Sequence, residues 1–260
     1  MKSYENKGFL YSSQGRTIRI LAEYLEPQSR INYHKVRDTI VFFGSSRFCD
    51  AATAEQRVAA AATDEQKAAA AKCLAGSLYY EQARELASRL TVWAKGVSAK
   101  EDRYVICSGG GPGIMEAANR GAHEAGGRSV GLNIDLPMEQ VPNPYITPEL
   151  SFEFHYFFMR KLWFAYLAKA LVIFPGGFGT LDEVMEILTL EQTKKFRKKM
   201  LIVLYGSDYW NKVLNFQAMQ DFGTISPEDL TLFQRADTPD AAFDILTTWL
   251  IENYSTAGPG

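Results

Sequence analysis

The chain has 260 residues, of which 47 % are hydrophobic and 22 % charged, and its formal net charge at pH 7 is -2. This is enough apolar sequence for one large core, and the near-neutral charge argues against nucleic-acid binding through a global basic field. The three cysteines form no CxxC pair and only three histidines are present, which argues against a zinc site and favours a reducing compartment.

The N-terminal residues MKSYENKGFLYSSQG lack the apolar core of a signal peptide. No window approaches the roughly 20 apolar residues of a membrane span. We therefore expect a cytoplasmic protein with no membrane partner. Residues 1–37, which include an amphipathic segment at 18–24, are predicted to form an N-terminal arm packed on the domain. Residues 38–260 are predicted to form that single domain.

From residue 38 onward, segments typical of strands alternate with segments typical of helices. Strands are predicted at 39–43, 104–107, 128–132, 150–154, 170–174, 200–205 and 230–233. Helices are predicted at 51–72, 79–95, 114–125, 156–169, 184–190, 209–219 and 239–253. Repeated alternation with short turns indicates an α/β, Rossmann-like, doubly wound parallel sheet with helices on both faces. The alanine-rich stretch at about 51–76 is interpreted as a helical insert.

Three glycine turns each follow a predicted strand: Gly44-Ser45-Ser46, Gly109-Gly110-Gly111 and Gly176-Gly177. Parallel strands end at one edge of a sheet, where ligands bind in open α/β folds. We therefore expect the three turns to line one site. The proline-rich loop 135–148 is either a lid over that site or a plain connection.

The glycine turns do not match the motifs that bind two or three phosphates. Counting from Gly111, the third glycine of a dinucleotide fingerprint is replaced by Glu116, and neither turn ends in Gly-Lys-Ser/Thr. A monophosphate held by one turn fits better. In Pro175-Gly176-Gly177-Phe178-Gly179-Thr180 such a turn precedes a predicted helix, whose free amides and dipole attract an anion.

Glu183 follows that turn and allows two interpretations. Thr180 and Glu183 match a capping box, in which the glutamate only bonds back to the helix start. The number of glycines before it exceeds what a cap needs, however, and favours a reactive carboxylate beside the anion. The helix dipole favours its ionised form, which suits activating water or stabilising a cationic transition state.

Two cations, Arg160 and Lys161, lie in the apolar predicted helix 156–169. Charges in such surroundings need an anionic partner, which is either an internal or subunit salt bridge or a ligand phosphate or ribose. The basic run 194–199 is interpreted as a solvated helix end.

Together these motifs resemble the LOG ("lonely guy") family of cytokinin riboside 5′-monophosphate phosphoribohydrolases, over roughly residues 38–235. The resemblance implies a homodimer or higher homo-oligomer, no metal and no cofactor. The implied reaction is hydrolysis of the N-glycosidic bond of adenosine 5′-monophosphate, plain or N6-substituted, to free base and ribose 5-phosphate. A non-catalytic carrier or sensor of a nucleotide or of the molybdenum cofactor is the alternative, because molybdenum-cofactor carriers share the fold and glycine pattern.

By the same resemblance Arg160 and Glu183 are the catalytic pair. The implied substrate-binding residues are Gly44, Ser45, Ser46, Gly110, Gly111, Met115, Lys161, Gly176, Gly177, Gly179 and Thr180. The chain departs from the family at Phe157, where a methionine commonly lies three residues before the arginine.

Overall fold

One parallel sheet organises the chain. The computed structural model describes residues 1–97, 102–136, 141–196 and 198–254. Its seven strands lie in the order β4-β3-β2-β1-β5-β6-β7, and every neighbouring pair is parallel. The strands are β1 (Thr39–Phe43), β2 (Val105–Ser108), β3 (Ser129–Ile134), β4 (Ser151–Phe154), β5 (Ala168–Ile173), β6 (Leu201–Tyr205) and β7 (Gln234–Ala236). The predicted doubly wound, Rossmann-like fold is confirmed.

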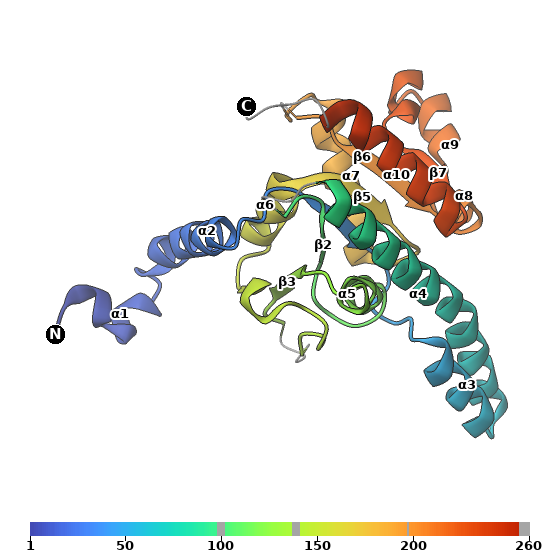
Figure 1. Ribbon diagram of the computed structural model, residues 1–260, viewed down its shortest axis with the longest axis horizontal. Helices are drawn as coiled ribbons and strands as arrows, with labels where there is room; N and C mark the ends of the chain where they lie inside the picture. Colours follow the sequence, from blue (N-terminus) through green and yellow to red (C-terminus); the bar gives the residue numbers. More distant parts are fainter. Residues whose placement is uncertain (98–101, 137–140, 197, 255–260) are drawn as a thin grey trace.

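Helices cover both faces of the sheet (Figure 1). They are α1 (Lys7–Leu10), α2 (Arg16–Tyr33), α3 (Ala51–Ala60), α4 (Asp64–Val97), α5 (Ile114–Glu124), α6 (Phe157–Leu167), α7 (Phe178–Gln192), α8 (Ser207–Val213), α9 (Phe216–Asp221) and α10 (Pro239–Tyr254). The short 3-10 helices are η1 (Ser3–Glu5), η2 (Pro148–Leu150) and η3 (Pro227–Thr231). Among the described residues, no helix is both long and apolar enough to span a bilayer.

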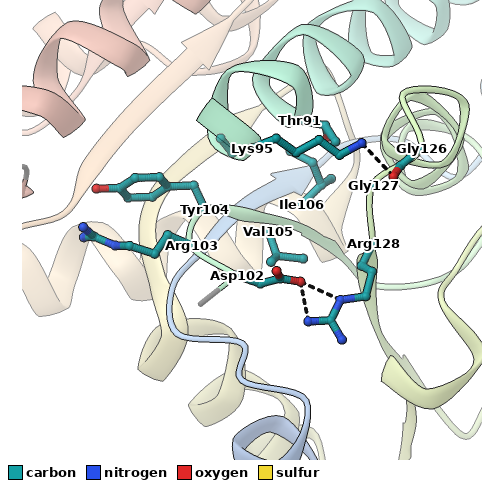
Figure 2. A pocket seen from close by; sticks show the side chains of 11 residues that line it. Thr91, Lys95, Asp102, Arg103, Tyr104, Val105, Ile106, Gly126, Gly127 and Arg128 are labelled. Carbon is teal, nitrogen blue, oxygen red and sulfur yellow. Dashed lines mark hydrogen bonds and ion pairs between the residues drawn. The ribbon is translucent and has the colours of Figure 1, made fainter. Parts of the chain in front are cut away.

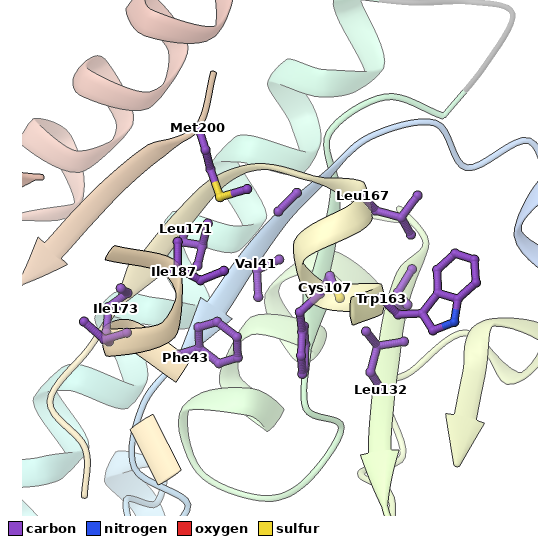
Figure 3. Close-up of a cluster of buried hydrophobic side chains, with 14 of the residues drawn as sticks. Val41, Phe43, Cys107, Leu132, Trp163, Leu167, Leu171, Ile173, Ile187 and Met200 are labelled. Carbon is purple, nitrogen blue, oxygen red and sulfur yellow. The ribbon is translucent and has the colours of Figure 1, made fainter. Parts of the chain in front are cut away.

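Alternate residues of β1 supply two separate cores, because successive strand side chains point to opposite faces. Val41 and Phe43 pack with buried residues of α6 and α7, in the cluster shown in Figure 3. Ile40 and Phe42 pack on the other face with residues of α4, α5 and α10. The central strand is therefore buried on both sides, which fixes its register and the position of the turn that follows it.

Two helical segments extend from the body of the molecule in opposite directions (Figure 1). One is formed by α1 and the outer part of α2, and the other by α3 and the first turns of α4. The prediction of helices at 51–72 and 79–95 is wrong about where the break lies. It falls at 61–63, where the Thr63 hydroxyl and the Gln66 side chain accept backbone N–H groups and so begin α4. Gly76 stays helical, with the Phe48 ring packed against it.

Two further boundaries differ from prediction because side chains cap new helix starts. The predicted helix 209–219 is divided into α8 and α9, since the Asn215 side chain accepts the Ala218 N–H. The predicted strand 230–233 is replaced by η3 and β7, since Ser226 and Asp229 form a capping box. In the basic run, Lys198 is not simply solvated, because its ammonium donates to three carbonyls at the end of α6 and the start of β5.

Candidate active site

The three glycine turns meet at the carboxyl edge of the sheet, as predicted. The site lies beside β1 and β5, where the winding of the sheet reverses. Ser45 joins the turns, because its N–H donates to the Pro175 carbonyl at 2.9 Å and its own carbonyl accepts from Ile114 N–H at 3.0 Å. Gly113 allows this approach. Its φ is +73°, and a Cβ there would lie 2.2 Å from the Ser45 oxygen.

A cavity of about 770 Å³ lies between these turns. The predicted site residues that line it are Gly44, Ser45, Ser46, Met115, Arg160, Gly176, Gly177, Gly179, Thr180 and Glu183. Most of the predicted set therefore converges on one space, although its members come from widely separated parts of the chain.

Three predicted site residues do not line the cavity. The carbonyls of Gly110 and Gly111 accept from the Asn143 side-chain amide at 3.0 and 3.1 Å, so this part of the turn is held by the loop 135–148. Residues 137–140 of that loop lie outside the described part of the chain. The Lys161 ammonium bonds to Asp182 at 2.8 Å and to Glu186 at 2.7 Å. It therefore forms the internal salt bridge that the sequence left open.

The turn before α7 has the geometry of an anion site. The helix begins with Gly177 as its N-cap, and Leu181 N–H donates to the Gly177 carbonyl. The amides of the first turn therefore have no partner within the helix. A Cβ on Gly177 or Gly179 would have no atom within 4 Å, so space remains beside these amides. The Tyr209 hydroxyl donates to the Gly176 carbonyl at 2.6 Å and fixes the turn.

This helix start rules out the capping-box interpretation of Glu183. Since the N-cap is Gly177 and makes no side-chain cap bond, Glu183 lies in the second turn of α7 and is not at the capping position. Its side chain is only 6 % exposed, and Oε1 accepts from Arg160 Nη2 at 3.1 Å. The carboxylate therefore faces the cavity wall and Arg160.

Burial changes the chemistry expected of this pair. Desolvation raises the pKa of Glu183 to about 7, against the opposing effect of the Arg160 charge. Burial thus opposes the ionised form that the helix dipole favours. Desolvation also lowers the pKa of Arg160, whose guanidinium lies 5.3 Å from the Phe157 ring and 5.6 Å from the Phe164 ring. A buried acid with a pKa near neutrality can exchange protons at physiological pH.

Gly109, from the second glycine turn, also lines the cavity, as expected of that turn. The sequence reasoning did not assign the remaining lining residues to the site: Phe43, Arg47, Phe48, Ile134, Leu136, Phe157, Phe164, Phe178, Leu181, Tyr209 and Val213. Adjacency to Ser46 could have indicated Arg47, and adjacency to the glycine turn could have indicated Phe178. The apolar members come from separate elements and shared no local pattern. They supply a hydrophobic wall that suits a planar aromatic group.

A smaller hollow of about 260 Å³ lies at the opposite, amino-terminal edge of the sheet (Figure 2). Its cations already have partners: Lys95 donates to the Gly126 carbonyl, and Arg128 pairs with Asp102. This hollow is therefore a weaker candidate for a ligand-binding site than the cavity at the glycine turns. Within the described residues, no cluster of three or more His, Cys, Asp or Glu side chains could hold a metal ion.

Comparisons with known proteins give a family match and several similar sequences. Residues 115–246 match a family model described as possible lysine decarboxylase. A probable cytokinin riboside 5′-monophosphate phosphoribohydrolase of Oryza sativa subsp. japonica is 27 % identical over 184 residues, covering 66 % of this chain and 77 % of the relative. An Arabidopsis thaliana cytokinin riboside 5′-monophosphate phosphoribohydrolase is 32 % identical over 127 residues, covering 47 % of this chain and 56 % of the relative.

Among solved structures, a molybdenum-cofactor carrier protein from Chlamydomonas reinhardtii superposes with a TM-score of 0.50 at 18 % identity. The superposition covers 83 % of this chain and 99 % of the carrier. At this level of identity the likeness extends to the fold alone.

Proposed function

The chain belongs to the LOG family, whose model is described as possible lysine decarboxylase, and from that premise we propose that it hydrolyses purine nucleoside 5′-monophosphates. The bond cleaved is the N-glycosidic bond of an AMP-like nucleotide, plain or N6-substituted. The products are the free base and ribose 5-phosphate. The observation that carries this proposal is the buried Arg160–Glu183 pair beside an open anion-binding turn in one cavity.

The geometry supports a division of roles. The 5′-phosphate accepts hydrogen bonds from the free amides at the start of α7 and from Thr180, which fixes the ribose against the cavity wall. Ionised Glu183 then stabilises positive charge developing on the ribose and orients a water molecule toward C1′. Water adds to C1′ and gives a proton to the Glu183 carboxylate, while the electron pair of the C1′–N bond leaves with the base, which takes up a proton from solvent.

Arg160 holds Glu183 in place and faces the same space. Its guanidinium donates to the carboxylate and lies near two aromatic rings, so its charge offsets part of the cost of ionising a buried acid. We assign it the role of keeping Glu183 in its ionised, oriented form and contacting the ribose or phosphate.

The lining of the cavity argues against the activity in the family description. Decarboxylation through pyridoxal phosphate needs a lysine for the Schiff base. Among the described residues, no lysine lines the cavity, and Lys161 is engaged by Asp182 and Glu186.

We also propose that the protein is a homodimer or higher homo-oligomer, cytoplasmic, and built as one domain (38–260) with an arm at 1–37. The outer surfaces of α6 and α7 expose large apolar side chains, of which Phe158 is 55 %, Tyr166 57 % and Phe178 93 % exposed. A second copy of the chain would bury them. Light scattering after size-exclusion chromatography tests this, and a monomer at micromolar concentration would contradict it.

The activity is tested by incubating the purified protein with AMP and with isopentenyladenosine monophosphate, followed by chromatography of the free base. We expect release of base, and Glu183→Gln should lower kcat by about 100-fold or more. Glu186→Gln is the matched control, a carboxylate on the same helix that pairs with Lys161. Folded protein that releases no base from any 5′-monophosphate would refute the proposal. Intact nucleotide or a pterin found by mass spectrometry of such inactive protein would identify a carrier instead.

A further inference from the structure

Helix α2 of the N-terminal arm holds the start of α6, the helix that carries Arg160. The Glu23 carboxylate of α2 accepts the backbone N–H of His155 at 2.8 Å and that of Tyr156 at 3.2 Å. The backbone carbonyl of Glu23 also accepts from Trp163 Nε1 at 3.0 Å. One residue of the arm therefore binds the two residues that lead into α6 and, again, a residue farther along the helix.

The start of α6 lacks a cap of its own. Its N-cap residue is Tyr156, which makes no side-chain cap bond, whereas helices usually begin at Ser, Thr, Asp or Asn. A carboxylate bonded to the amides at this end also interacts favourably with the helix dipole. Glu23 thus anchors, from another helix, the residue before the N-cap and the N-cap residue itself, at a helix start that makes no side-chain cap bond of its own.

The second half of α2 can act as a support because it packs on the body of the molecule, where Pro27 and Ile31 are buried. The Tyr24 and Trp163 rings lie 5.9 Å apart. Farther along α2, the Arg30 guanidinium donates to the Ser151 carbonyl at 3.0 Å and lies 4.1 Å from the Phe152 ring centre. Glu23 is therefore fixed against both α6 and the segment around β4.

Arg160 lies one turn after the capped end, and its N–H donates to the Tyr156 carbonyl at 3.2 Å. A shift of the first turn of α6 would therefore move Arg160 away from Glu183. The charged groups that act on Glu183 come from both helices at this place: Arg160 and Lys161 from α6, and Asp182 and Glu186 from α7. Only the α6 pair is positive, so loosening α6 removes cations from the neighbourhood of the carboxylate.

We propose that Glu23 is a positioning residue for catalysis, which acts by fixing the first turn of α6 and hence the Arg160–Glu183 pair. Its effect on turnover rests on the proposed hydrolase function. The phosphate turn at the start of α7 is held by other contacts, so Glu23 should affect turnover more than substrate binding.

The kinetic test compares Glu23→Ala and Glu23→Gln with Glu26→Ala in the full chain. Glu26 is the control because it lies on the same helix, is 57 % exposed and pairs with Arg30. For Glu23→Ala we expect kcat to fall about tenfold, as small misplacements of reacting groups do, while KM changes less than about twofold. The acid limb of the pH profile should move to higher pH, because a carboxylate that loses Arg160 becomes harder to ionise. Glu23→Gln, which keeps one acceptor oxygen, should lie between the wild type and Glu23→Ala.

A lower apparent kcat with an unmoved acid limb of the pH profile would mean only that less protein is folded. That outcome would overturn the positioning role. The second measurement needs no substrate: amide hydrogen exchange at residues 155–160 should become faster in Glu23→Ala and not in Glu26→Ala. Unchanged exchange there would overturn the proposal. If exchange accelerates while the wild type itself releases no base, the support given to α6 stands and the hydrolase function fails.

Discussion

The buried Glu183 carboxyl makes a specific prediction for the pH dependence of stability. Its pKa is raised from 4.5 to about 7 in the folded chain. A raised carboxyl pKa means that the stability contributed by this group is fully present below pH 4.5 and is lost as pH rises through 7. At about 1.4 kcal/mol per pKa unit, the full loss is about 3.5 kcal/mol, of which about 2.5 kcal/mol falls between pH 5 and 8.5.

The substitution Glu183→Gln removes this titration with little change in volume. Its unfolding free energy minus that of the wild type should therefore rise by about 2.5 kcal/mol from pH 5 to pH 8.5. Urea unfolding at matched pH values measures this difference, and the subtraction cancels every other titrating group. A constant offset from leaving Arg160 without its partner does not affect the slope.

Glu186→Gln is the control, because this carboxylate is 39 % exposed and paired with Lys161. We expect a much smaller rise with pH for this variant, because the Glu186 charge has only a minor effect on the Glu183 pKa. The difference in unfolding free energy between Glu183→Gln and the wild type could instead stay flat or fall as pH rises. Either result would refute the reasoning that burial affects the Glu183 pKa more than the Arg160 charge does.

Three more predictions follow from the site. The value of kcat/KM should fall tenfold per pH unit below about 7, because Glu183 becomes protonated. Steady-state assays that give a flat profile from pH 5.5 to 8 would exclude Glu183 as the essential base. Gly179→Ala should raise KM about tenfold or more, because the new Cβ occupies the space proposed for the phosphate. It should not lower Tm, because that Cβ meets only open space in the protein. An unchanged KM would place the phosphate elsewhere. Asn143→Ala should lower the free energy of unfolding by about 2–3 kcal/mol in urea, because the Gly110, Gly111 and Asn119 oxygens lose this donor. A decrease below about 0.5 kcal/mol would contradict this prediction.

The sequence was sufficient to predict the parallel sheet and the edge of it at which the candidate site lies. Buried parallel strands are continuous apolar runs, and β1, β5 and β6 each show one followed by a turn. The glycine turns were also visible, because close backbone approach at positions such as Gly113 requires glycine in that place. Both signals are local, so the fold and most of the site could be predicted.

The features that were missed depend on contacts between distant parts of the chain. The contact of Glu23 with His155 joins residues separated by 132 positions, and no local pattern marks it. The pKa of Glu183 likewise depends on how deeply α7 and α6 pack together, whereas its place in a helix suggested only the dipole. Gly110 resembled a ligand contact in the motif, but its carbonyl is bonded by Asn143 from a loop 33 residues away.

The α3–α4 hairpin has a practical consequence for engineering. It leaves the body just after Ser45, whose backbone joins the glycine turns, and its tip at 61–63 lies away from the sheet (Figure 1). Residues added at that tip would lengthen two helices without displacing any group that lines the site. The tip is therefore a suitable place to insert a fluorescent reporter or an affinity peptide.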